Sequence, residues 1–159
     1  ITVDDIISEA MRIVRRDADA KNISVNEEIA SGLQIEADRR AVKQILLNLM
    51  SNAVKFSRQD GDILVRARIV SGCLRISIED NGIGISKEDM RKLGRPFEQA
   101  QNQLTRNHNG SGLGLAISRS LAEMHGGAIK IRSRIGEGTI VSLQLPLRKS
   151  DTKTKRQTS

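Results

Sequence analysis

The sequence predicts an α+β fold, a two-layer α/β sandwich with helices on one face of a mixed sheet. Three segments place apolar residues at helical spacing, and five others alternate apolar with polar residues, as strands with one buried face do. The strands do not alternate regularly with the helices, which argues against a purely parallel sheet of βαβ units. A length of 159 residues suffices for one domain with one sizeable core.

The first half of the chain predicts a helix, a strand, a second helix and a hairpin. Residues 4–22 begin with two acids, which favour a helix N-terminus, and continue with apolar residues at helical spacing. The sequence ISVNEEI alternates like a strand, and Asp38 can cap a second helix that runs to about Phe56. The segments ILVRARIV and CLRISIED alternate on either side of Ser71-Gly72, which indicates a hairpin with one buried face.

The second half contains a long polar stretch, a helix and two strands. Between Lys87 and Asn109 only the short helical piece KEDMRKLG interrupts a polar sequence, and such a stretch in a compact domain is usually functional or disordered. A helix at about 113–125 ends at Gly126-Gly127, a common glycine stop. The sequences AIKIRSR and TIVSLQLP follow as strands around a turn at 136–138.

The composition excludes several classes of protein. Phe56 and Phe97 are the only aromatic residues, so a surface that stacks nucleic-acid bases is not expected. The tail 148–159 carries five basic residues and one acid, a net charge of +4 out of +7 for the whole chain. We expect this tail to be disordered. It is either a solvated end or a segment for docking or for steering phosphates. Cys73 is the single cysteine and no apolar run reaches membrane-spanning length, so we expect a cytoplasmic domain, whose parent protein could be membrane-anchored.

Two asparagines in the second helix are candidates for a binding site. Asn48 and Asn52 lie four residues apart and share a face at the edge of the apolar stripe, with Lys55 beside them. Asparagine is a poor helix former, so the pair is either tolerated at an exposed position or placed there for function. A side-chain amide oxygen suits Mg²⁺, which usually keeps waters and substrate phosphates as well, and Lys55 could face a phosphate.

Two glycine-containing segments add to this candidate site. The strand that ends at Asp80 continues into Asn-Gly-Ile-Gly-Ile, which is either a plain turn or a place where a carboxylate accepts a hydrogen bond from an exocyclic amine. The sequence NGSGLGLAIS places Gly110, Gly112 and Gly114 at the start of a helix, whose free N–H groups favour anions. It lacks the lysine of the Walker motif and the last glycine of the dinucleotide fingerprint.

In this order, the segments resemble the boxes of the GHKL (Bergerat) ATP-binding fold, which sensor histidine kinases share with type II topoisomerases, MutL and heat-shock chaperones. Over residues 1–147 the chain is similar to the catalytic, ATP-binding (HATPase) domain of bacterial sensor histidine kinases. NLMSNAVKFS resembles the N box, DNGIGI the first glycine box, RPFEQ the F box and GSGLGLAIS the second glycine box. The F box has Gly94-Arg95 where many relatives carry an acid. In this respect the sequence resembles cell-cycle kinases of the PleC and DivJ type.

The resemblance implies a role for each residue of the boxes. Asn52 would hold Mg²⁺ with support from Asn48, and Lys55 would meet the phosphates. Asp80 would accept a hydrogen bond from the adenine amino group, with Phe56 and Thr139 close to the ring. Asn48, Lys55 and Arg106 are the implied catalytic residues, with Arg106 reaching the γ-phosphate from a mobile lid. The implied ATP site comprises Asn48, Asn52, Lys55, Phe56, Asp80, Gly82, Gly84, Ile85, Phe97, Arg106, Gly110, Ser111, Gly112, Leu113, Gly114, Leu115 and Thr139.

The resemblance also indicates which reaction to expect. The ATP-hydrolysing branches of the family carry a glutamate four residues before the metal-binding asparagine, where this chain has Asn48, which cannot take a proton. A histidine acceptor needs less help, since a neutral imidazole already offers a lone pair. We therefore expect transfer of the γ-phosphoryl group of ATP–Mg²⁺ to a histidine, with slow ATP hydrolysis.

The acceptor histidine is not expected in this chain. Neither His108 nor His125 precedes the sequence pattern of an acceptor helix; His125 is expected to be structural, and His108 is either lid surface or a phosphate contact. The partners would be the dimerisation and histidine phosphotransfer helices, absent from this chain, and a downstream response regulator in a phosphorelay, and the domain alone is expected to be monomeric. Two other hypotheses stay open: a nucleotide-binding regulatory switch without productive transfer, and a nucleic-acid-binding module, which the scarcity of aromatic residues opposes.

Overall fold

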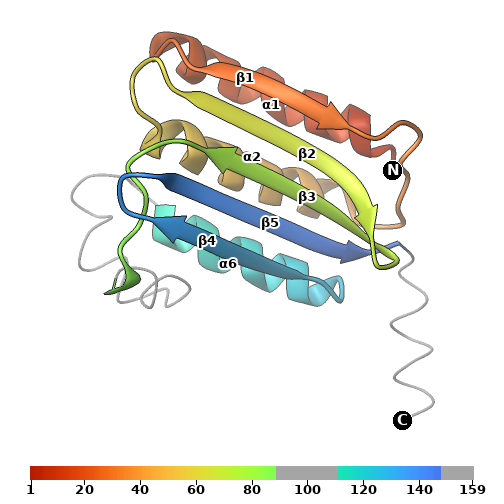
Figure 1. The fold of residues 1–159 in the computed structure, drawn as a ribbon. Helices are drawn as coiled ribbons and strands as arrows, with labels where there is room; N and C mark the ends of the chain where they lie inside the picture. Colours follow the sequence, from red (N-terminus) through yellow and green to blue (C-terminus); the bar gives the residue numbers. More distant parts are fainter. Residues whose placement is uncertain (89–110, 148–159) are drawn as a thin grey trace.

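The computed structural model describes residues 1–88 and 111–147, in which helices cover one face of a β-sheet and leave the other face open (Figure 1). The predicted α+β sandwich and the predicted order of helices and strands are confirmed. In chain order the elements are α1 (Val3–Ala20), β1 (Ser24–Ile29), α2 (Arg39–Phe56), β2 (Asp62–Val70), β3 (Cys73–Asp80), α6 (Ser111–Met124), β4 (Ala128–Arg134) and β5 (Gly138–Pro146).

The sheet is mixed, with its strands in the order β1-β2-β3-β5-β4. β1 runs parallel to β2, and the other neighbouring pairs are antiparallel. The last strand of the chain therefore lies inside the sheet, between β3 and β4. This register places Thr139, at the start of β5, opposite Asp80, at the end of β3.

The aliphatic core continues along the sheet into this polar pair. Leu74, Ile76 and Ile78 alternate along the helix-facing side of β3 and are at most 1% exposed. Asp80 is the next residue on the same side, and it is buried too. The apolar row thus ends in a carboxylate that is largely withdrawn from water.

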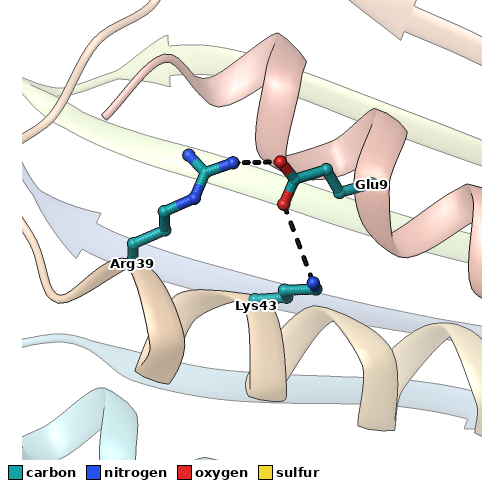
Figure 2. A network of polar contacts seen from close by, with 3 residues as sticks. All are labelled: Glu9, Arg39 and Lys43. Atoms are coloured by element: carbon teal, nitrogen blue, oxygen red, sulfur yellow. Dashed lines mark hydrogen bonds and ion pairs between the residues drawn. The ribbon is translucent and has the colours of Figure 1, made fainter.

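The helices pack through the apolar stripes that the sequence indicates. Ile6 and Ile7 of α1 and Ile45 and Leu46 of α2 are completely buried. At the helix surface, Glu9 of α1 contacts both Arg39 and Lys43 of α2 (Figure 2). These three side chains are partly exposed to solvent, so their ion pairs add little stability. No helix in the described residues is both long and apolar enough to span a membrane.

The ends of α2 and α6 are connected by a histidine. Asp38 caps α2 as predicted, because its carboxylate accepts from the backbone N–H groups of Arg40 (2.9 Å) and Ala41 (3.4 Å). The backbone N–H of Asp38 donates to Nε2 of His125 at 3.3 Å, so Nδ1 carries the ring proton and donates to the Leu121 carbonyl at 2.8 Å. The structure therefore agrees with a structural role for His125.

Replacing this imidazole tests that role. His125→Phe keeps a ring but removes both hydrogen bonds, and we expect the free energy of unfolding to fall by about 1–2 kcal/mol in urea denaturation. Met124→Ala is the control, because Met124 is 76% exposed and its truncation should change stability by less than about 0.5 kcal/mol. A His125→Phe variant as stable as the unmodified chain would contradict the assignment.

Candidate functional site

The centre of the candidate site is the buried pair at the ends of β3 and β5. Asp80 is 6% exposed and Thr139 is 8% exposed. One carboxylate oxygen of Asp80 accepts a hydrogen bond from the backbone N–H of Gly82 at 2.9 Å. Burial raises the pKa of Asp80, and nearby Glu79 adds to the rise, while backbone hydrogen bonds from Gly82 and Thr139 oppose it. A carboxylate in such a setting is a strong acceptor for an amine that enters the site without water.

Ser133 of β4 connects this pair to the first glycine box. Its hydroxyl accepts from the backbone N–H of Ile85 (2.7 Å), donates to the Gly138 carbonyl (2.9 Å) and lies 2.8 Å from the Thr139 hydroxyl. Because the only proton of Ser133 goes to Gly138, the Thr139 hydroxyl must donate to Ser133. The lone pairs of Thr139 thus stay available to accept hydrogen bonds. Ser133 was not predicted, since nothing separates it in sequence from any other polar residue of an alternating strand.

The glycines of the first box allow backbone segments to pack closely against one another. A Cβ atom on Gly82 would lie 2.2 Å from the carbonyl oxygen of Phe56, and one on Gly84 would lie 2.0 Å from that of Arg134. Gly84 also has φ of +76°, a conformation that favours glycine. These glycines therefore let the loop pack closely between the end of α2 and the turn that joins β4 to β5.

Further backbone hydrogen bonds hold the same loop. The N–H of Ile83 donates to the Phe56 carbonyl at 3.4 Å, and the N–H of Gly136 donates to the Ile83 carbonyl at 2.8 Å. The structure therefore brings together three separate parts of the chain: the end of α2 at Phe56, the first glycine box that begins at Asp80, and the turn at Gly136 between β4 and β5.

Asn48 connects α2 to α6. Its amide nitrogen donates to the Gly114 carbonyl (3.1 Å) and to the Ser118 hydroxyl (2.9 Å), and its amide oxygen accepts from Gln44 (3.0 Å). Ser118 is completely buried and was not predicted as part of the site. These contacts give Asn48 a role in holding the second glycine box against the N box.

The other predicted residues are distributed as follows. Asn52 and Lys55 are half-buried on α2, one turn and two turns beyond Asn48. α6 begins at Ser111, so Gly112 and Gly114 lie in its first turn as predicted, while the side chain of Leu115 is part of the apolar core. Phe97, Arg106, His108 and Gly110, together with the side chains of Ser111 and Leu113, lie outside the described residues.

The residues present fit a metal that is held mainly by its nucleotide. Within residues 1–88 and 111–147, no group of three or more histidine, cysteine or acidic side chains could hold a metal ion. A half-buried amide such as that of Asn52 can supply one oxygen ligand to Mg²⁺, with phosphate oxygens and waters completing the shell.

The fold and these boxes define a class of ATP-binding domain. The chain belongs to the family of histidine kinase-, DNA gyrase B- and HSP90-like ATPases, which matches it over residues 37–149. It is 44% identical over 158 residues to a protein of Caulobacter vibrioides named non-motile and phage-resistance protein, covering 97% of this chain and 19% of that protein. It is also 44% identical over 144 residues to the histidine protein kinase DivJ of the same organism, covering 90% of this chain and 24% of DivJ.

Solved structures agree with the resemblance predicted from the sequence. The catalytic domain of histidine kinase ThkA superposes with a TM-score of 0.81 at 26% identity, covering 94% of this chain and 95% of that domain. Full-length ShkA in complex with AMPPNP gives a TM-score of 0.76 at 30% identity, covering 92% of this chain and 30% of ShkA. The predicted similarity to catalytic domains of histidine kinases, including the DivJ type, is thereby confirmed.

The raised pKa of Asp80 predicts how stability depends on pH. At pH values between 3.8, the ordinary pKa of an aspartate, and the raised pKa, the Asp80 carboxyl holds its proton in the folded state but loses it in the unfolded chain. The stability contributed by Asp80 is therefore present at low pH and is lost as the pH rises through the raised pKa. We expect the free energy of unfolding of the unmodified chain, relative to Asp80→Asn, to fall as the pH rises above the ordinary value of 3.8 in denaturant titrations. A difference that stays constant or increases as the pH rises would contradict the assignment.

Proposed function

We propose that this chain binds ATP with Mg²⁺ and donates the γ-phosphoryl group to a histidine on separate dimerisation helices, as the catalytic domain of a histidine kinase in two-component signalling. The observation that carries the proposal is the buried Asp80–Thr139 pair, placed by the sheet beside the end of α2 and the first glycine box. Membership of the ATPase family and similarity to named histidine kinases support it.

Asp80 and Thr139 would recognise the adenine. The carboxylate of Asp80 would accept a hydrogen bond from the exocyclic amine, and the lone pairs of Thr139 would add a further acceptor. Phe56 would flank the ring from the end of α2, since its own carbonyl contacts the loop that follows Asp80. Because both side chains are buried, the base would bind in a site with little competing water.

The helices would bind the triphosphate. Asn52 would supply the amide oxygen for Mg²⁺, which neutralises phosphate charge when bound, and Lys55 would contact the phosphates one turn later. The first N–H groups of α6, around Gly112, would bind phosphate oxygens. Arg106 is proposed to approach the γ-phosphate during transfer.

The reaction needs no strong base from this chain. A neutral imidazole nitrogen attacks the γ-phosphorus, the bond from phosphorus to the bridging oxygen breaks, and ADP leaves. Asn48 cannot act as a general base, and its amide is engaged with α6, which favours a histidine acceptor over water. Catalysis by this chain is therefore mainly positioning and charge stabilisation.

The acceptor and the regulator would be other domains or proteins. The chain spans about a fifth to a quarter of the two Caulobacter relatives, so the parent protein is proposed to carry the dimerisation helices and to act in the cytoplasm, with or without a membrane anchor. Residues 1–147 would be the catalytic domain and 148–159 its basic tail. Histidine kinase ThkA has been solved in complex with the response regulator protein TrrA, which supports a response regulator as the downstream partner here.

Calorimetric titration with a non-hydrolysable ATP analogue and Mg²⁺ tests nucleotide binding. We expect one site per chain, an affinity at least about tenfold weaker in Asp80→Asn, because the acceptor charge is lost, and an altered metal dependence in Asn52→Asp. Glu27→Gln is the control, since Glu27 is an exposed acid on β1, an edge strand that does not neighbour β3 or β5, so its affinity should stay near that of the unmodified chain. Absence of binding, or equal effects of the Asp80 and Glu27 substitutions, would contradict the proposal. Binding without transfer of labelled phosphate to the dimerisation helices of the parent protein would favour a regulatory switch.

A further inference from the structure

The side chain of Lys21 reaches the C-terminal end of α2, the helix that carries the asparagine pair. Its ammonium group donates to three carbonyl oxygens, those of Val54 (2.9 Å), Lys55 (2.8 Å) and Ser57 (3.1 Å). An ammonium group has three protons, so these contacts use its full donor capacity. Lys21 therefore acts on the helix end and is not itself a ligand for phosphate.

These contacts complete the hydrogen bonding of a helix end that would otherwise be open. The last carbonyls of a helix have no donor within the helix. The Ala53 carbonyl accepts from the backbone N–H (3.0 Å) and hydroxyl (2.6 Å) of Ser57, and the Phe56 carbonyl accepts from Ile83. With Lys21 added, every carbonyl from Ala53 to Ser57 has a donor. A cation at this end also interacts favourably with the helix dipole.

The backbone holds Lys21 in place for this role. Lys21 follows the last residue of α1, and Asn22 turns the chain with φ of +53°. The N–H of Ile23 closes the turn on the Ala18 carbonyl at 2.9 Å, and the Lys21 carbonyl accepts from the N–H of Asp60 at 2.8 Å. The ammonium group is therefore presented to α2 from a turn that is fixed on both sides.

The helix end is in direct contact with the candidate site. One of the carbonyls bound by Lys21 is that of Lys55, the proposed phosphate contact. The next carbonyl, that of Phe56, lies so close to Gly82 that a Cβ atom would not fit between them. A displaced last turn of α2 would therefore move Lys55, Phe56 and the first glycine box together.

We propose that Lys21 is a positioning residue of the nucleotide site, whose ammonium group holds the last turn of α2 in the conformation that presents Lys55 and Phe56 to ATP. The inference rests on the proposed nucleotide binding. It extends the site to a residue outside every sequence box, 33 positions before the first carbonyl that it contacts.

Lys21→Met tests the inference, because methionine keeps much of the length but removes the charge and all three donors. Affinity for a non-hydrolysable ATP analogue with Mg²⁺ is measured by calorimetry at a temperature where circular dichroism shows every variant folded. We expect the dissociation constant to rise about tenfold in Lys21→Met. In Lys21→Arg, which keeps a cationic donor, we expect it to return most of the way to the value of the unmodified chain.

A core variant separates positioning from stability. Leu145→Ala removes a buried side chain toward the far end of β5, six residues beyond Thr139, so it should lower Tm and leave the dissociation constant within about twofold. Unchanged affinity in Lys21→Met, or an equal loss in Leu145→Ala, overturns the inference. If Lys21→Met does not fold, Lys21→Gln is tested instead, and unchanged affinity in Lys21→Gln overturns the inference. Failure of the unmodified chain to bind overturns the proposed function and this inference with it, whereas binding by all variants alike overturns the inference alone.

Discussion

The burial of α2 against the sheet is the interaction on which the rest of the structure depends. Ile45, Leu46 and Leu49 are at most 1% exposed, and each such side chain contributes about 1.5–3 kcal/mol by leaving water. This packing fixes the rotation of the helix, and the rotation decides where the edge of its apolar stripe lies. Asn48, at that edge, reaches α6, and the helix end reaches the loop after Asp80.

The candidate site consists of short contacts between segments that are far apart in sequence. The turn after α1 holds the end of α2 through Lys21, and the end of α2 holds the first glycine box through the Phe56 carbonyl. On its other side that box is held by Ser133 and the turn between β4 and β5. Because most of these contacts are made by backbone groups, they orient the loop without using the side chains that the proposed mechanism assigns to ATP.

Local sequence patterns predicted the elements well, because each element carries its own signal. Asp38 marks the start of α2, and alternation of apolar residues identifies β2 and β3 to within a residue. Pairing between distant strands has no such signal, so the parallel pairing of β1 with β2 and the interior place of β5 were not predicted. For the same reason Lys21, Ser118 and Ser133 went unnoticed, since their partners become apparent only in three dimensions. The glycines of the first box were found, but their close contacts with Phe56 and Arg134 were not predicted, because the sequence cannot tell close approach of a ligand from close approach of another backbone segment.

The central claim is that the nucleotide lies between the C-terminal half of α2 and the ends of β3 and β5, on the face of the sheet that the helices cover (Figure 1). Backbone amide chemical shifts of the isotope-labelled chain, recorded with and without a non-hydrolysable ATP analogue and Mg²⁺, test it most directly. The claim predicts large shifts at Gly82, at Thr139 and in the first turn of α6, and small ones on the open face of the sheet, at Arg75 of β3 and Lys130 of β4. Shifts that gather at Arg75 and Lys130, or saturable binding that leaves Gly82 and Thr139 unchanged, would contradict it.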